Sequence, residues 1–372
     1  MDNILLIASS ESDSNIYYAS GFLAPDSFVY LATKGKTYLL MSDLEVDRAR
    51  AQSKVDDVLS YSDYEEKAKA SGGASTFIAV VSVLLNEVGI TDLTVPFNFP
   101  LEYGDALRAL GYTLSIKKEP FFAARAIKTA DEVIAIRNAQ IAVEKAFDGV
   151  VDLLRNAKIE GNHIYSEGVL LTSELVRKKL HLKMMEEGCG AEHTIVACGV
   201  DACDPHNVGT GPLRAHEPII FDIFPRSIDT RYFADMSRTV VKGTPSDPLK
   251  KLYATVLEGQ ELGISRVRAG ANGKAIHEEI VALFEKRDYK TGRVNGRMQG
   301  FFHGTGHGVG LDIHESPSIS RRDCVLQKGE VVTVEPGLYY PEIGAVRIED
   351  MVLVEENGCR NLTTYPKFLE IQ

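Results

Sequence analysis

The sequence lacks the features that mark several large classes of protein. Its five cysteines are an odd number without C-x-x-C spacing, which argues against a disulfide framework and a structural zinc site. No apolar run approaches the ~20 residues that span a bilayer, so we expect no membrane segment. The start, MDNILLIASSESD, has no basic segment, so we expect no secretory signal and a cytoplasmic protein. The net charge of -11, without a long Lys/Arg cluster, argues against nucleic acid as a partner.

Three catalytic signatures are also missing. The sequence has no H-E-x-x-H zinc helix and no G-x-S-x-G elbow, which argues against single-zinc proteases and serine hydrolases. Four alternating glycines occur in FFHGTGHGVGLDIHE, residues 301–315, but they lack the G-x-G-x-x-G form and the lysine of a P-loop. We therefore discard a phosphate cradle, and the three histidines of this segment still need an explanation.

What is present indicates a large core and more than one domain. Hydrophobic residues make up 44% of the 372, and the length suggests roughly two to three domains. Residues 1 to about 117 alternate apolar strands (NILLIA, FVYLAT, TYLLM) with helices (STFIAVVSVLLNEVG, LEYGDALRALG), an α/β pattern. The segment KKEPFFAARAIK follows as the expected linker. We expect domains at 1–120 and 121–372.

The second part has a different pattern. Helices are predicted at 129–157, where Thr129 and Glu132 form a capping box, and at 166–187, 246–268 and about 271–287. The predicted strands are HTIVACG, PIIFDIF, ADMSRTVV, EVVTVEP and AVRIEDMVLVE. Helices grouped around strands that hairpins and long crossings connect favour an α+β fold with a curved sheet.

Four acids fall within or at the ends of these apolar strands: Asp222, Asp235, Glu335 and Glu349. A buried carboxylate is costly unless its charge is compensated. A salt bridge, for instance to Arg238, would explain one of them. It cannot explain four, because Arg238 and Arg347 are the only basic residues in those segments. A pair of divalent metal ions would compensate the rest.

His307 gives this set one nitrogen ligand. Two aspartates, two glutamates and one imidazole suit Mn, Co, Fe or Zn ions in a shared two-metal site. The glycines on either side of His307 would let the backbone pass close to the metals and to a substrate.

The sequence resembles the creatinase/aminopeptidase superfamily of metallopeptidases, which has the pita-bread fold, and within it the proline dipeptidase and Xaa-Pro aminopeptidase branch. The segments AARAIKTADEVIAIRNA, FADMSRTV, HGTGHGVGLDIHE and TVEPGLYYPEIGAVRIEDMVLV match motifs of that branch in the right order. The N-terminal part, including DSNIYYASGFLAPDSFVYLATKGKTYLLMSDLEVDRA, resembles the creatinase-type N-terminal domain. The resemblance covers nearly the whole chain.

The resemblance implies five metal ligands. Asp222 would bind one ion, Asp235 and Glu349 would bridge both, and His307 and Glu335 would hold the other. Asp222 and Asp235 are 13 residues apart, about two more than is common in the family. We interpret the difference as a longer hairpin turn, PRSIDTR, and treat Asp229 as the less favoured ligand.

The resemblance also implies an activity. It predicts hydrolysis of the bond before proline in short peptides, with Glu335 as general base and the ions as Lewis acids. His206 and His314 match positions that contact the substrate and stabilise the tetrahedral intermediate, His303 matches a substrate-side position, and Arg347 would orient a carboxylate. Relatives suggest a homodimer.

Five histidines lie outside these motifs and are predicted to be surface or packing residues: His163, His181, His193, His216 and His277. Two other functions stay open. One is a metal-independent, creatinase-like amidinohydrolase, and the other is a non-catalytic peptide-binding protein. The five retained ligands argue against both.

Overall fold

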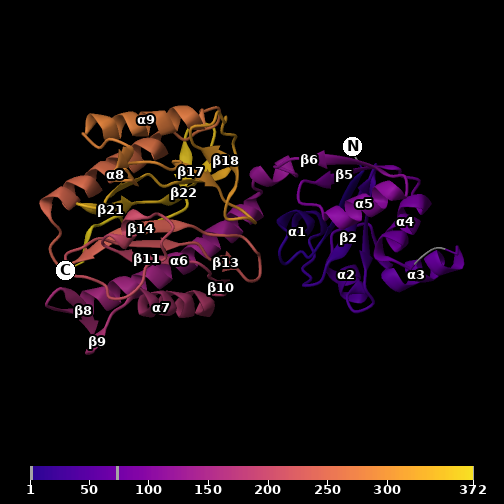
Figure 1. Cartoon of the computed structure of the whole chain (residues 1–372), viewed down its shortest axis with the longest axis horizontal. Helices are drawn as coiled ribbons and strands as arrows, with labels where there is room; N and C mark the ends of the chain where they lie inside the picture. The colour runs from indigo at the N-terminus through magenta and orange to yellow at the C-terminus, as the bar shows by residue number, and fades with distance from the viewer. Residues whose placement is uncertain (1–2, 73–74, 372) are drawn as a thin grey trace. The chain divides into compact units, whose positions relative to one another are not determined.

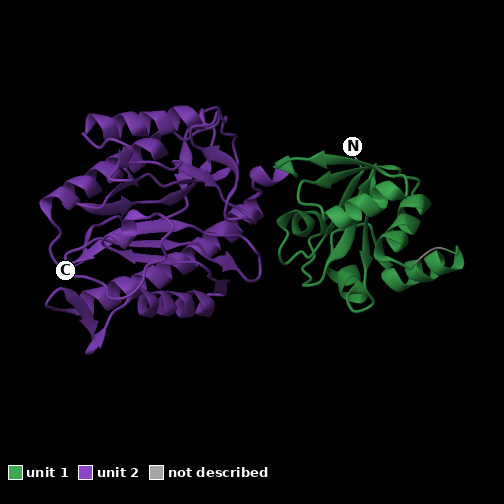
Figure 2. Cartoon of the chain, viewed as in Figure 1, with its two compact units in different colours: residues 1–123 green, residues 124–372 purple. Residues whose placement is uncertain are grey.

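The structure, a computed structural model, describes residues 3–72 and 75–371. The chain divides into two compact units, residues 1–123 and 124–372 (Figure 2). Among the described residues, no helix is both long and apolar enough to cross a bilayer.

Unit 1 is built on a six-stranded mixed sheet with the order β4-β3-β2-β1-β5-β6 (Figure 1). The strands are β1 (Ile4–Ala8), β2 (Phe28–Thr33), β3 (Lys36–Met41), β4 (Asp57–Ser60), β5 (Asp92–Pro96) and β6 (Thr113–Lys117). The helices are α1 (Ser14–Ser20), α2 (Val46–Gln52), α3 (Tyr61–Ala70), α4 (Phe77–Glu87) and α5 (Leu101–Ala109).

Unit 1 has two hydrophobic clusters, and β1 contributes to both because its side chains alternate between the two faces of the sheet. Leu5 and Ile7 pack in the cluster that contains α4, whereas Leu6 packs with Ile16 of α1. The predicted strands and helices of this part are confirmed. Strands β4, β5 and β6 and helices α1, α2 and α3 were not predicted.

Unit 2 places strands between two pairs of helices, with α6 and α7 on one side and α8 and α9 on the other (Figure 1). The helices are α6 (Ala130–Asn156), α7 (Ser173–Glu186), α8 (Asp247–Arg266) and α9 (Gly273–Lys286), with 3-10 turns η1 (Ala123–Ala126) and η2 (Asp201–Cys203). The capping box of Thr129 and Glu132 starts α6 as predicted.

Two sheets carry most of the strands of unit 2. One has the order β11-β12-β14-β24 and the other β18-β17-β19-β22-β23. Their strands are β11 (Ile195–Cys198), β12 (Ile219–Ile223), β14 (Met236–Lys242), β17 (Gly306–Gly308), β18 (Glu315–Ile319), β19 (Val331–Val334), β22 (Asp350–Val354), β23 (Cys359–Asn361) and β24 (Glu370–Ile371). Smaller pieces are β7 (Lys158–Glu160), β8 (His163–Ser166), β9 (Val169–Leu170), β10 (Cys189–Gly190), β13 (Arg226–Ser227), β15 (Gly292–Val294), β16 (Arg297–Gln299), β20 (Gly337–Tyr340) and β21 (Gly344–Arg347). The α+β arrangement is as predicted.

Two boundaries were predicted wrongly. The helix expected from residue 166 begins at Ser173, because Glu167 and Gly168 take positive φ in the turn between β8 and β9. The single strand expected over AVRIEDMVLVE is two strands, β21 and β22, separated by Ile348 and Glu349. This break places Glu349 in the site described next.

Candidate metal centre and active site

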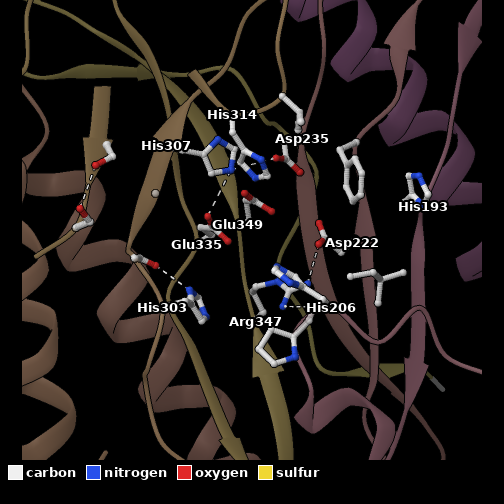
Figure 3. Close-up of a pocket in the computed structure, with 18 of the residues that line it drawn as sticks. His193, His206, Asp222, Asp235, His303, His307, His314, Glu335, Arg347 and Glu349 are labelled. Carbon is white, nitrogen blue, oxygen red and sulfur yellow. Dashed lines mark hydrogen bonds and ion pairs between the residues drawn. The ribbon is translucent and has the colours of Figure 1, made fainter. Parts of the chain in front are cut away.

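Unit 2 contains a cavity of about 770 Å³ that brings together every site residue predicted from the sequence (Figure 3). Its walls include Asp222, Asp235, His307, Glu335, Glu349, His206, His303, His314 and Arg347. These residues come from segments that are up to 143 positions apart, at 206 and 349. The fold therefore makes one site from them.

The acids lie where strands begin or end. Asp222 lies within β12, and its strand partner in β14 is Ser237, so Asp235 just precedes that paired stretch. Glu335 directly follows β19, and Glu349 directly precedes β22. Strands β19 and β22 pair in antiparallel orientation. His307 lies in β17, which pairs with β19.

Arg347 compensates one of the four carboxylates. Its Nη2 donates to Asp222 Oδ2 at 2.7 Å, and its Nε donates to the hydroxyl of Ser237 at 3.0 Å. The Ser237 hydroxyl lies 2.8 Å from Glu349 Oε2. Arg347 therefore lies on the Asp222 side of the cavity, where it contacts one of the predicted ligands.

Two oxygens on the other side are buried without a partner. Asp235 is 4% exposed and Glu349 1% exposed. Among the described residues, neither Asp235 Oδ1 nor Glu349 Oε1 has a hydrogen-bond partner. Leaving a buried acceptor without a hydrogen bond is costly. We therefore expect these two oxygens to bind a ligand that is not part of the chain.

His307 presents a nitrogen lone pair to these acids. Its Nδ1 lies 3.2 Å from the carbonyl oxygen of Gly308, to which it can only donate. The proton on Nδ1 leaves Nε2 as the acceptor nitrogen, 3.6 Å from Asp235 Oδ2 and 3.5 Å from Glu335 Oε1. A backbone carbonyl that fixes the tautomer in this way is typical of metal-binding histidines.

Burial sets the protonation states of the site. Desolvation, followed by the charge of Glu349, raises the pKa of Asp235 well above its ordinary value. Desolvation and the neighbouring acids likewise raise the pKa of Glu349, and desolvation raises that of Glu335 to about 8 despite Arg347. Desolvation and His314 lower the pKa of His307 to about 4, so its imidazole is neutral. The protein alone cannot stabilise the full negative charge of this cavity.

The donor set fits a divalent cation. Ligand atoms of Asp235, His307 and Glu349 all lie within 4.8 Å of one another. Carboxylates and a neutral imidazole are the ligand types of Mn, Fe, Co and Zn sites. The orphaned oxygens and the oriented Nε2 make these three residues the most direct candidates for holding a metal ion.

His303 ends a chain of hydrogen bonds that the sequence did not reveal. Its Nδ1 donates to the carbonyl oxygen of Gly304 at 2.8 Å, so its Nε2 accepts from the Tyr339 hydroxyl at 2.9 Å. The Tyr339 oxygen accepts in turn from Arg347 Nη1 at 3.0 Å. The one available signal for Tyr339 was its position in TVEPGLYY, four residues after Glu335.

The glycines around His307 allow a close backbone approach of a kind that the sequence did not indicate. A Cβ on Gly306 would lie 1.9 Å from the carbonyl oxygen of Thr333, and one on Gly308 would lie 2.5 Å from that of Ser316. The close neighbours are thus backbone atoms of this part of the chain. The glycines allow tight strand packing, which positions His307.

The segment after His307 is fixed by two buried cations. Glu315, next to His314, receives Lys128 Nζ at 2.5 Å and Arg125 Nη2 at 2.9 Å. The rings of His314 and His307 meet edge to face with centroids 4.4 Å apart. The segment AARAIK matched a family motif, but nothing in the sequence indicated this contact across nearly 190 positions.

Three further residues were considered in the sequence analysis, and the structure places them as follows. His193 is exposed, in agreement with the predicted surface position, but it also lines the cavity and takes a positive φ of 56°. His277 is buried as a packing residue, with its Nδ1 2.9 Å from the hydroxyl of Thr305. Asp229 is exposed in the hairpin turn, whereas Asp222 lines the cavity.

Comparison with known proteins gives the family. The model of metallopeptidase family M24 matches residues 134–356, and that of the creatinase/prolidase N-terminal domain matches residues 3–118. A Xaa-Pro dipeptidase of Pyrococcus horikoshii is 28% identical over 94% of this chain and 90% of its own length.

Two solved structures share the whole fold. An X-Pro aminopeptidase from Thermotoga maritima has a TM-score of 0.82 at 25% identity and covers 100% of this chain and 97% of its own. A Xaa-Pro dipeptidase from Bacillus anthracis has a TM-score of 0.83 at 26% identity and covers 99% of this chain and 94% of its own. The predicted family branch and pita-bread fold are confirmed. The chain is therefore a metallopeptidase and belongs to family M24, with a creatinase/prolidase N-terminal domain before its catalytic unit.

Proposed function

We propose that this protein hydrolyses the peptide bond between an N-terminal residue and a following proline, using two divalent metal ions. The observation that carries the proposal is the buried cavity, where four carboxylates surround a neutral histidine. Two of these carboxylates, Asp235 and Glu349, each have a buried oxygen without a partner among the described residues. Relatives named Xaa-Pro dipeptidase and X-Pro aminopeptidase, alike over nearly the whole chain, support the preference for proline.

Five residues would hold the ions: Asp222, Asp235, His307, Glu335 and Glu349. Among the described residues, Arg347 is the single arginine that donates to this set, so one divalent ion would leave part of the carboxylate charge uncompensated. When bound, the ions would supply Lewis acidity at the substrate carbonyl and lower the pKa of a water. Mn, Co, Zn and Fe all suit these ligands.

The protein's own groups would position the reactants and move the proton. Glu335 accepts a proton from the attacking water as general base, because it lies in the cavity beside His307. His206 and His314 line the same cavity and would donate hydrogen bonds to the oxygen of the tetrahedral intermediate. His303, held by Tyr339, forms part of the substrate wall.

Metal analysis combined with peptide cleavage tests this function. The purified protein is loaded with Mn, Co or Zn, and is then given Xaa-Pro dipeptides, longer Xaa-Pro peptides and matched peptides in which alanine replaces proline. We expect about two bound ions per chain and cleavage of the proline peptides alone. Absence of cleavage with every metal would refute the proposal.

The same samples separate the two alternatives. A creatinase-like amidinohydrolase would act on creatine after chelation of all metal, and a peptide-binding protein would bind Xaa-Pro peptides without cleaving them. We expect neither result, because the set of candidate ligands is complete. We also propose a homodimer that acts in the cytoplasm, and light scattering after size exclusion measures that assembly.

A further inference from the structure

A fully buried serine lies between two candidate metal ligands of the active site. Ser237 lies in β14, directly opposite Asp222 of β12. Its hydroxyl oxygen is 3.0 Å from Asp222 Oδ1 and 2.8 Å from Glu349 Oε2. One hydroxyl group therefore contacts two of the predicted ligands, which come from different strands and from distant parts of the sequence.

Main-chain hydrogen bonds fix the position of Ser237 relative to Glu349. The amide of Glu349 donates to the carbonyl oxygen of Ser237 at 3.1 Å. Arg238 Nη1 donates to the carbonyl oxygens of both residues, at 2.9 Å for Ser237 and 2.6 Å for Glu349. The backbone therefore holds the two side chains next to each other, in addition to their own hydrogen bond.

Arg347 determines the direction in which the Ser237 hydroxyl donates. The Nε–H group of Arg347 can only donate, and it lies 3.0 Å from the serine oxygen. The oxygen is thus the acceptor in this contact, and the hydroxyl proton remains available for a carboxylate. Thr239, two residues further along β14, donates to the carbonyl oxygen of Arg347 at 2.9 Å and accepts from its amide at 3.0 Å. Both ends of Arg347 are therefore fixed by hydroxyl groups of β14.

The single hydroxyl proton of Ser237 cannot serve both carboxylates at the same time. Asp222 already receives Arg347 Nη2 at 2.7 Å on its other oxygen (Figure 3). Glu349 has no comparable partner, because among the described residues the Ser237 hydroxyl is the single donor to its carboxylate. Loss of the hydroxyl would therefore leave Asp222 with its ion pair and Glu349 without any hydrogen bond to its carboxylate.

We propose that Ser237 is a positioning residue for metal binding, which holds the Glu349 carboxylate in place for the ions. The inference rests on the proposed metal-dependent function. A carboxylate that a hydrogen bond already orients loses less side-chain freedom when an ion binds, so its affinity for the ion is higher. Arg347 acts on Glu349 through this hydroxyl, whereas it contacts Asp222 directly.

Calorimetry of Mn binding to the metal-free protein tests this role without any substrate. Ser237→Ala removes the hydroxyl, whereas Ser237→Thr keeps it and suits a strand. The control is Ser20→Ala in unit 1, another fully buried serine, whose hydroxyl donates to the carbonyl oxygen of Ile16 at 2.7 Å. Circular dichroism checks that each variant is folded.

The expected changes differ between the three variants. Ser237→Ala should bind Mn about 10–100-fold more weakly than the native protein, as is typical when a residue that hydrogen-bonds a metal ligand is lost. Ser237→Thr should keep most of the native affinity, because its hydroxyl can replace that of the serine. Ser20→Ala should keep all of it.

The possible results separate this role from the peptidase function. Native affinity for Mn in Ser237→Ala, or an equal loss of affinity in Ser237→Thr, overturns the role of the hydroxyl while cleavage of Xaa-Pro peptides stands. Weaker Mn binding in Ser237→Ala alone, in a protein that cleaves no Xaa-Pro peptide with any metal, supports the role and refutes the peptidase. An equal loss of Mn affinity in Ser20→Ala would also overturn the role, and a native protein that binds no divalent metal would overturn both proposals.

Discussion

Glu349 and Asp350 are neighbours in the sequence, and both are almost completely buried, yet their surroundings are opposite. Asp350 is 0% exposed and receives Arg238 at 2.9 Å, Lys367 at 2.7 Å and the Asn361 amide at 2.9 Å. Glu349 receives the Ser237 hydroxyl on one oxygen, and its other oxygen has no partner among the described residues. Successive side chains at a strand point to opposite faces, which separates the two environments.

The difference distinguishes a structural carboxylate from one that awaits a ligand. Although burial raises the pKa of Asp350, Arg238 and Lys367 outweigh it and hold that pKa below its usual range. Burial and the other acids raise the pKa of Glu349 well above its usual range. The protein supplies cations for Asp350, whereas we propose that a metal ion compensates Glu349.

The largest effect is expected on the Asp350 side. Arg238→Met leaves a buried aspartate short of its main cation and should lower the free energy of unfolding of unit 2 by about 3–5 kcal/mol. Urea unfolding followed by circular dichroism measures this, since the chain has no tryptophan. The control Arg266→Met, from an exposed pair with Glu279, should cost less than about 1 kcal/mol. Equal losses of unfolding free energy in the two variants would show that the ion pair of Arg238 with Asp350 is no more important than an exposed pair.

The second effect concerns turnover on the Glu349 side. His307→Ala should lose bound metal and activity together, because it removes the oriented Nε2. His314→Ala should keep the metal and lose about 10²–10³-fold in kcat, as expected for a donor to the reacting oxygen. Metal content by plasma emission spectrometry, alongside peptide cleavage, checks both variants. Equal metal loss would mean that the two rings act as one ligand cluster.

A smaller effect is expected for Glu349→Gln, which should not destabilise the metal-free protein. The substitution removes one of the crowded acids, so the metal-free protein should be as stable as the native one or more stable, by up to about 1–2 kcal/mol. Its stabilisation by added Mn should disappear. Thermal unfolding with and without Mn measures both quantities. A clear destabilisation of the metal-free variant would place Glu349 with Asp350 as a structural carboxylate.

The smallest effect is expected for Tyr339→Phe. It removes the hydroxyl between Arg347 and His303, which is worth about 0.5–1.5 kcal/mol and thus roughly tenfold or less in kcat/KM. Combining it with His303→Ala in a double-mutant cycle gives the coupling between the two residues. Strict additivity would show that the hydrogen-bond chain does not support the site.

The sequence predicted the residues of the cavity better than their partners. A buried carboxylate in an apolar strand is unfavourable whichever face of the strand it occupies. Four such acids with only two arginines nearby therefore indicated a shared site that binds cations. Arg238 was the simple candidate to neutralise one of them, but it pairs with Asp350, which the sequence did not single out. That pairing depends on the break after β21, which sets the face that each residue takes, and a continuous apolar pattern does not reveal such a break.

Contacts between distant segments were also beyond sequence reasoning. Lys128 and Arg125 meet Glu315 from about 190 positions away, and Tyr339 joins His303 to Arg347. These residues lie in segments that match family motifs, but a motif match does not show which residues contact one another. Only the packing of unit 2 gives them a role.

The hairpin between Asp222 and Asp235 keeps one register from the pair Ile223–Met236 to the bridge Arg226–Phe233, which affects how this protein can diversify. The ladder fixes both aspartates before the chain reaches its turn at 228–231, so residues added or exchanged at the tip leave the carboxylates where they are. The tip can therefore change in length and charge while the two aspartates keep their positions. Substitutions in this turn are therefore expected to leave the two candidate metal ligands in place.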